Sequence, residues 1–143
     1  MPHQLSDSAV DLQNLPMYYS AVAAADVAVG AAGTYVDAVT LGTLPPGIYL
    51  VTAQAQYLNG AGAAFVNGKL LVGTQILGAS EQSCIVSGSC QVWVTALIHV
   101  TVPAGSVVKL QVTSTTATGS VKAADANGGA NTGTTYIHAV RLQ

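Results

Sequence analysis

The chain has 143 residues, of which half are hydrophobic and only 7% are charged, against roughly 25% in an average soluble domain. Its net charge is −2 with four basic residues, so no surface can gather the cations that a nucleic acid requires, and nucleic-acid binding is excluded. The most apolar stretch, residues 17–32, contains Asp26 and many small residues, so we expect no membrane span. A surface with so little charge predicts instead an oligomer whose copies cover much of it.

The first 33 residues are predicted to form an N-terminal arm and a first strand, ahead of a second unit over residues 34–143. The opening residues have neither the basic nor the apolar region of a secretory signal, so we expect none. Apolar spacing after Ser6 favours a short helix, but the segment is too short to be stable alone and is expected to lie along a neighbour. The candidate anchoring side chains of this arm are Leu5, Leu12, Leu15 and Met17.

Strands are predicted wherever apolar and polar residues alternate. Residues 18–29 are interpreted as one strand that ends in a Gly-Ala-Ala-Gly turn, and residues 34–41 as the next. Residues 44–57, LPPGIYLVTAQAQY, open with a Pro-Pro-Gly turn and give the clearest alternation. A strand with one fully apolar face packs against a second sheet. The residues on that face are Tyr49, Val51, Ala53, Ala55 and Tyr57.

The middle of the chain contains a strong turn signal at Asn67-Gly68, because a two-residue hairpin turn needs positive φ at both of its central positions. We therefore predict a hairpin turn there. Residues 72–77 are expected to continue as a strand, and the polar residues 80–83 are expected to form a loop.

Two further alternating segments, residues 91–102 and 106–115, predict long strands, and residues 135–142 predict a closing strand. Residues 117–134 are loop by composition. The total is about eight to ten strands with turns every 8 to 12 residues, which is the spacing of an all-β sandwich or barrel.

Three of these segments occur in the order found in a known family. LPPGIYLVTAQAQY resembles the Pro-Gly-x-Tyr strand of tumour-necrosis-factor-like (TNF-like) and C1q-like jelly rolls, VTVPAGSVVKLQV resembles a later strand after its turn, and TTYIHAVRL resembles the closing strand. The resemblance covers most of residues 34–142 and is one of pattern. It implies an antiparallel two-sheet jelly-roll sandwich that forms tight homotrimers. The Ala-, Thr- and Gly-rich version resembles domains of phage virion proteins and of some bacterial surface proteins.

Two cysteines, Cys84 and Cys90, flank the sequence Ile-Val-Ser-Gly-Ser. A tight turn would bring them opposite each other and permit a local disulfide, whereas a reducing cytosol would keep both as free thiols. The sequence leaves both alternatives open. No base suited to a catalytic cysteine is evident.

The three histidines have no metal-ligand spacing within one chain. Around a threefold axis, copies of His99 or His138 would form a ring that binds an ion or senses pH, but we favour hydrogen-bonded interface histidines. His3 lies in the arm. Trp93, Tyr57 and Tyr136 are candidates for a sugar platform, although aromatic residues on sandwich strands are usually core.

The Gly-rich segment 117–134 is the candidate loop for partner contacts, because loops of this length often carry them. Its oxygen-bearing residues hint at calcium, but the closing Glu of a calcium-binding loop is absent, so we expect no metal and no cofactor. The candidate contact residues are Lys122, Asp125, Asn127 and Asn131.

No motif of an esterase, zinc protease, P-loop protein or dinucleotide-binding enzyme is present, so we expect no enzymatic activity. The leading hypothesis is a trimeric decoration or cement protein of a phage capsid, located in the virion after assembly in the host cytoplasm and bound to the major capsid protein or another virion component. The alternatives are the carbohydrate-binding tip of a phage fibre, which would bind a host surface glycan through the 117–134 loop, and a bacterial surface adhesin.

Overall fold

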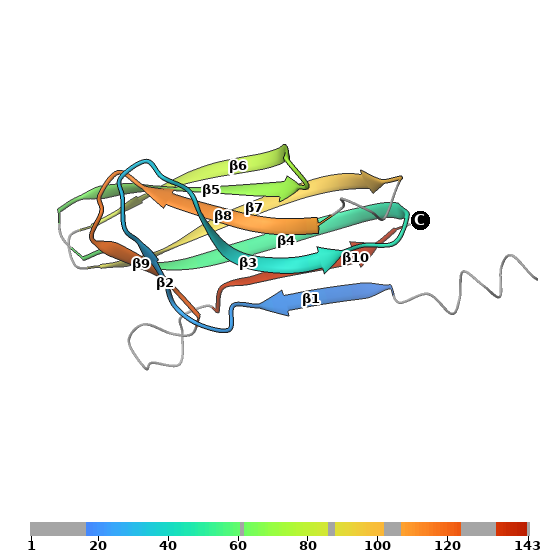
Figure 1. Cartoon of the computed structure of the whole chain (residues 1–143), viewed down its shortest axis with the longest axis horizontal. Helices are drawn as coiled ribbons and strands as arrows, with labels where there is room; N and C mark the ends of the chain where they lie inside the picture. Colours follow the sequence, from blue (N-terminus) through green and yellow to red (C-terminus); the bar gives the residue numbers. More distant parts are fainter. Residues whose placement is uncertain (1–16, 61, 86–87, 102–106, 124–133, 143) are drawn as a thin grey trace, which may run out of the picture.

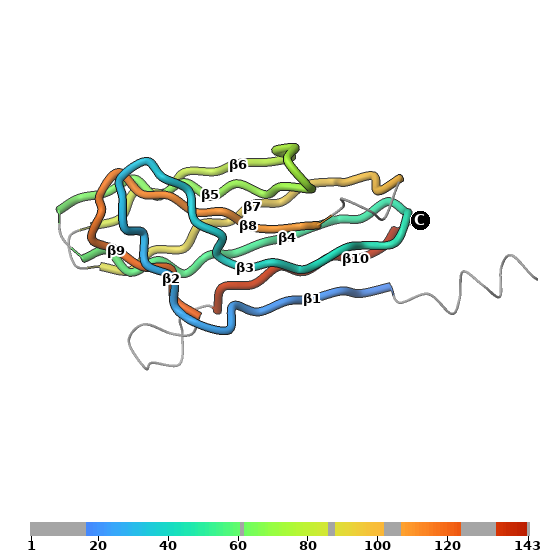
Figure 2. The backbone as a smooth tube through the Cα atoms, in the orientation of Figure 1, coloured from blue at the N-terminus to red at the C-terminus, as the bar shows by residue number. Residues whose placement is uncertain are grey.

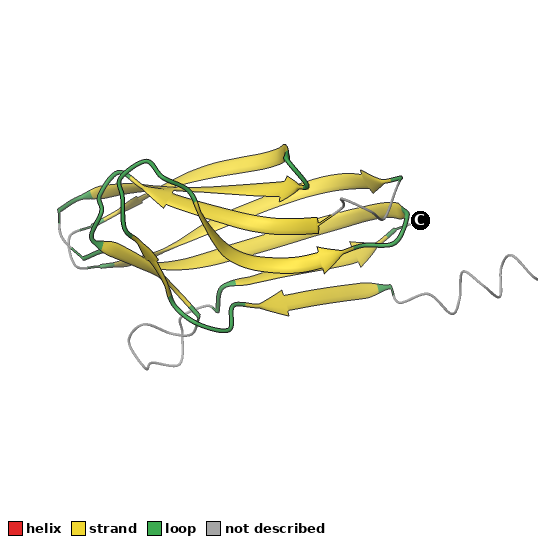
Figure 3. Cartoon of the chain, in the orientation of Figure 1, coloured by secondary structure: helices red, strands yellow, loops and turns green. Residues whose placement is uncertain are grey.

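A computed structural model describes residues 17–60, 62–85, 88–101, 107–123 and 134–142 (Figure 1). All regular secondary structure in these ranges is β-strand, as Figure 3 shows, and they contain no helix long and apolar enough to cross a membrane. The strands form two antiparallel sheets that pack face to face in an elongated sandwich, which confirms the predicted jelly roll. The anchoring candidates Leu5, Leu12 and Leu15 lie outside the described residues.

Sheet A is organised around its longest central strand. It contains β1 (Tyr18–Val22), β2 (Val27–Val29), β4 (Gly47–Leu58), β7 (Ser89–Val100), β9 (Gly119–Lys122) and β10 (Tyr136–Arg141). Strand β4 pairs with β7 along its whole length, and its other edge is shared between β10 and β9. Strand β1 adds to the free edge of β10, and β2 adds to β9.

Sheet B has the strand order β3-β8-β5-β6. Its members are β3 (Val36–Thr43), β8 (Val107–Ser114), β5 (Ala64–Val72) and β6 (Gln75–Cys84). Strands β6 and β7, which follow each other in sequence, lie on the same side of the sandwich and carry the chain from sheet B to sheet A (Figure 2). Ser80 links the two sheets on this side, because its hydroxyl donates a hydrogen bond to the Trp93 carbonyl at 2.5 Å.

The core lies between the sheets and follows the predicted alternation. The apolar face of residues 44–57 is confirmed, because Tyr49, Val51, Ala53, Ala55 and Tyr57 are all completely buried. The inward side chains of the other long strands follow the same alternation: those from Val92 to Val100 in β7 and from Val108 to Val112 in β8 are aliphatic and buried. Burial of this apolar surface, at about 25 cal/mol per Å², is the main stabilising term of the fold.

The hairpin turn predicted at Asn67-Gly68 is wrong. Both residues lie inside β5, and the chain reverses at Gly73, which has φ of 59°, and Thr74. Gly68 is required for another reason: a Cβ there would lie 2.7 Å from a methyl carbon of Val92 on the opposite sheet. The glycine therefore allows close packing of the sheets rather than a turn.

Three other boundaries differ from the prediction. Residues 18–29 form two strands rather than one, interrupted at 23–26. The polar segment 80–83 is strand, because it pairs with β5 at an edge where Glu81, Gln82 and Ser83 are exposed to solvent. Part of the predicted loop 117–134 is strand β9, whose Gly119 fits beneath Tyr57: a Cβ would lie 1.8 Å from the tyrosine hydroxyl.

Candidate assembly interface

The outward side of β1, β10, β4 and β7 forms a continuous surface, which we call the A face. Strand pairing aligns its side chains in cross-strand rows, for example Tyr18–Val140–Leu50–Leu97 and Ser20–His138–Thr52–Thr95. A third row is Val22–Tyr136–Gln54–Trp93. With His99 beyond the rows, the A face consists of Tyr18, Ser20, Val22, Leu50, Thr52, Gln54, Trp93, Thr95, Leu97, His99, Tyr136, His138 and Val140.

Large apolar side chains are exposed on the A face. Leu97 is 65% exposed, and the other members are between 41% and 57% exposed. Scattered single apolar residues are normal on a surface, but contiguous apolar residues mark a site of interaction. The exposed members are Tyr18, Val22, Leu50, Trp93, Leu97 and Val140.

The A face carries no Asp, Glu, Lys or Arg. The one charged residue on these four strands is Arg141, which points inward, is 8% exposed and donates from Nη2 to the Pro46 carbonyl at 2.9 Å. Covering the A face would therefore bury no formal charge, apart from any that its histidines acquire.

Aromatic rings run diagonally across the A face. Trp93 and Tyr136 meet edge to face at 6.2 Å between centroids, Tyr136 stacks on His138 at 4.2 Å, and His138 lies 5.5 Å from Tyr18. Partial burial, with a smaller electrostatic effect from Tyr18, raises the pKa of Tyr136. Such rings supply large contact areas with little conformational freedom to lose on binding.

The outward side of sheet B, which we call the B face, has a different composition. Lys109 Nζ lies 3.1 Å from Asp37 Oδ2, and Gln111 Nε2 donates to Asp37 Oδ1 at 2.6 Å. The Gln111 hydrogen bond, opposed by burial and helped by Lys109, lowers the pKa of Asp37. Lys69 lies over the Tyr35 ring at 3.7 Å. The strands of this face carry four charged residues: Asp37, Lys69, Glu81 and Lys109.

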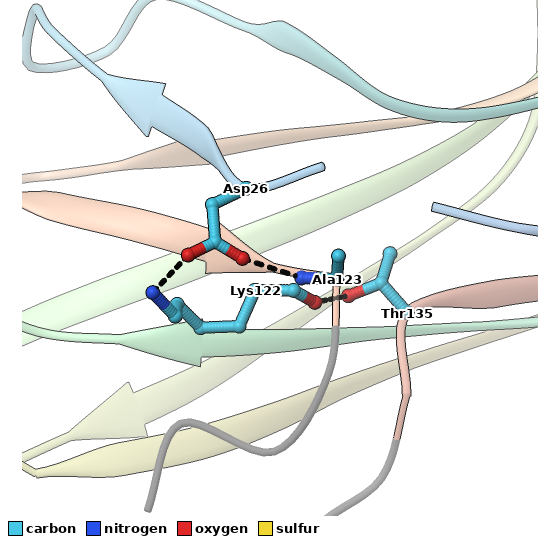
Figure 4. A network of polar contacts seen from close by, with 4 residues as sticks. All are labelled: Asp26, Lys122, Ala123 and Thr135. Carbon is cyan, nitrogen blue, oxygen red and sulfur yellow. Dashed lines mark hydrogen bonds and ion pairs between the residues drawn. The ribbon is translucent and has the colours of Figure 1, made fainter. Parts of the chain in front are cut away.

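The predicted contact loop is tied down at its base, as Figure 4 shows. Lys122 forms an ion pair with Asp26, whose Oδ1 accepts the Ala123 amide at 2.9 Å. Both contacts, the Lys122 hydrogen bond first, lower the pKa of Asp26. Thr135, fully buried, donates to the Lys122 carbonyl at 2.7 Å and accepts the Gln56 amide at 2.9 Å.

Of the four predicted contact residues, Lys122 is thus engaged in holding the loop base, and Asp125, Asn127 and Asn131 lie outside the described residues. Within the described residues, no three His, Cys, Asp or Glu side chains gather where they could hold a metal ion.

The other predicted site residues separate in the fold. Trp93 and Tyr136 lie on the A face, but Tyr57 is fully buried between the sheets, so the three cannot form one sugar platform. His99 and His138 are outward on the A face. Met17, the described residue of the anchoring set, is half-exposed and its carbonyl accepts the Arg141 amide at 2.8 Å.

The sequence predicted a surface covered by other copies, with His99 or His138 at an interface, but it did not locate the A face, because each strand was interpreted by itself. Its signal was present: β7 alternates Trp93, Leu97 and other outward residues with a fully apolar inward set, so both of its sides are partly apolar. A strand apolar on both sides is covered on both sides.

Neither a family model nor a curated protein matches the sequence. Among solved structures, the chain is similar to Eiger TNF from S. frugiperda, with 13% identity, 90% of this chain and 94% of that chain covered, and a TM-score of 0.50. It is also similar to murine APRIL at pH 8.5, with 12% identity, 87% and 98% covered, and a TM-score of 0.50. At these identities the likeness shows the fold, a TNF-like jelly roll.

Proposed function

We propose that this TNF-like jelly roll is a non-enzymatic structural protein that assembles into a homotrimer through the A face and decorates a phage capsid. The observation that carries the proposal is the A face itself: contiguous, apolar and aromatic, and without formal charge. Such a composition matches the core of permanent subunit interfaces, which are depleted in charge and enriched in aromatic residues.

A second copy of this chain is the occupant that best suits this surface. Near a symmetry axis each residue meets its own copy, so any charge there would face a like charge. The A face avoids that repulsion, whereas the B face, with Lys69 and Lys109 outward, does not. The jelly-roll resemblance, whose family forms tight trimers, favours three copies.

The virion assignment is supported by the sequence as a whole. The Ala-, Thr- and Gly-rich composition resembles that of domains in phage virion proteins, and the low overall charge fits a subunit that is largely covered by copies of itself. In the proposal the arm contacts the major capsid protein, and the trimer projects from the capsid or cements it.

The assembly is tested by measuring the mass of the purified full-length chain in solution by light scattering. The expected result is three times the chain mass across the micromolar range. A single-chain mass throughout that range contradicts the proposal, because a permanent interface does not dissociate at these concentrations.

Attachment is tested separately with undecorated capsids. A variant lacking residues 1–16 is expected to remain trimeric but to lose co-sedimentation with capsids that the full-length chain retains. Undiminished binding of the truncated trimer would reject the arm as the anchor, and failure of the full-length chain to bind would reject the capsid assignment.

The aromatic strip also favours a second candidate, a carbohydrate-binding tip of a fibre. Trp93 is 49% exposed and Tyr136 lies beside it, and exposed aromatic rings stack on sugar rings. The discriminating measurement is a glycan array with the wild type and Trp93→Ala. A glycan signal lost in that variant would support this candidate, and no signal from the wild type would reject it. A surface adhesin would be favoured by a genomic neighbourhood without capsid or tail genes.

A further inference from the structure

The connection between β6 and β7 brings the two cysteines of the chain together. Cys84 is the last residue of β6 in sheet B, and Cys90 is the second residue of β7 in sheet A. Between them the chain reverses in a turn in which the Gly88 amide donates to the Ile85 carbonyl at 3.2 Å. The Cys84 thiol reaches across this turn and donates to the Gly88 carbonyl at 3.6 Å.

The turn is held in place by a buried side chain from another loop. Asn59, 1% exposed, donates from Nδ2 to the Ile85 carbonyl at 3.0 Å, and its backbone amide donates to the Gly88 carbonyl at 2.9 Å. Its Oδ1 accepts a hydrogen bond from Thr116 Oγ1 at 3.3 Å. The two ends of the turn are therefore fixed relative to β4, and the cysteines that flank it keep their mutual position.

The two thiols are free and in contact with each other. Cys84 is buried, and Cys90 is half-buried against the core. Burial first, and the hydrogen bond with Cys84 second, raise the pKa of Cys90. The Cys90 thiol therefore stays protonated at neutral pH, so it reacts slowly until an oxidant is supplied.

We propose that Cys84 and Cys90 are an oxidation site, at which a disulfide forms within the folded chain and joins the edge of sheet B to the edge of sheet A. The inference is independent of the proposed function, since the site lies at the β6–β7 turn and not on the A face. Outside a reducing cytosol the bond is the stable form, and inside it the thiols persist.

The reaction proceeds by thiol–disulfide exchange with a small disulfide such as oxidised glutathione. The Cys90 thiolate, the more accessible of the two, attacks the disulfide and releases one glutathione thiolate. The Cys84 thiolate then displaces the second glutathione and forms the intramolecular bond. In sum, two protein thiols lose two protons and two electrons, and one oxidised glutathione becomes two reduced molecules.

The test incubates the native full-length chain with oxidised glutathione, then unfolds it and alkylates free thiols before mass spectrometry. The expected product lacks two hydrogens, takes up no alkylating agent and contains one peptide pair linked through Cys84 and Cys90. It should form faster as the pH rises, because the reactive species is the thiolate. Its melting temperature should exceed that of the reduced chain by about 5 °C, the scale expected for closing a short loop.

The matched control is Cys90→Ser, which replaces the more accessible thiol by a hydroxyl of similar size. Its melting temperature should not respond to oxidised glutathione. Two alkylatable thiols after prolonged oxidation, a stable glutathione adduct on one cysteine, or disulfides only between chains would each overturn the proposal. A disulfide that forms only after urea is added would also overturn it, because the folded geometry would then not bring the sulfurs together.

Discussion

The two outer faces of the sandwich rest on the same two-residue alternation and the same core, but their outward positions differ. The B face presents Asp37, Lys69, Glu81 and Lys109 to solvent, as an ordinary soluble sheet does. The A face presents Tyr18, Trp93, Leu97 and further apolar residues without a formal charge, and the ion pair of Lys122 with Asp26 lies beyond it, at β9. Both sheets enclose the same core, so the difference between their outward residues reflects what each face contacts outside the subunit.

A charge placed on the A face tests the difference between the two faces most directly. Leu97→Lys should raise the dissociation constant of the assembly by about 100-fold or more, because an unpaired ammonium would be desolvated in the interface. Leu97 is 65% exposed in the subunit, so folding should be unaffected. The measurement is the mass in solution over a dilution series.

The matched control carries the same charge on the B face. Ser83→Lys, at an exposed position of β6, should leave the mass unchanged. If both variants dissociated to the same extent, or if neither dissociated, the two faces would not differ in their role in assembly.

A substitution at Gly68, between the sheets, tests the stability of the subunit apart from its assembly. Gly68→Ala places a Cβ 2.7 Å from Val92 between the sheets and should lower the free energy of unfolding by about 1–3 kcal/mol through overpacking. The control is Gly30→Ala, where the added Cβ has no atom within 4 Å. Urea unfolding of both, in the dissociated Leu97→Lys background, gives the comparison; equal midpoints would show that the sheets can separate without cost.

The smallest effect is expected on the B face, at the pair of Asp37 and Lys109. Asp37→Asn should cost about 0.5 kcal/mol, as exposed ion pairs usually do, with no change in assembly. The pKa of Asp37 is lowered in the folded chain, so its contribution is present above the unfolded pKa and is lost as pH falls through the folded one. Acid unfolding of wild type and Asp37→Asn should therefore converge at low pH; curves that stay parallel would count against this pairing.

The sheets and the core could be predicted from the sequence because alternation is a local signal. Residues 44–57 show this: their inward side chains are determined by the chain itself once one face is apolar. The Asn67-Gly68 turn was wrong because a glycine has two uses, and only the distance to Val92 on another strand decides between them.

The outward apolar residues of β7 could be recognised from the sequence, but the rows of the A face could not. Its rows are made by strand pairing between segments that are distant in sequence, such as Tyr18 with Val140, and no local pattern gives the register. Lys122 shows a different error. The sequence placed it in a loop as a candidate contact residue, but in the fold it forms an ion pair with Asp26, which is distant in sequence.

Strand β1 is joined to sheet A on one side only, through five residue pairs with β10, and its N-terminal end lies beside the C-terminal end of β10. A tether attached through residues 1–16 would pass any tension into this single strand pair. Because the hydrogen bonds of an antiparallel pair lie across the strands, tension along β1 would strain all of them at once, whereas tension across it would peel them apart in sequence. The direction from which the subunit is pulled would therefore decide how firmly it holds.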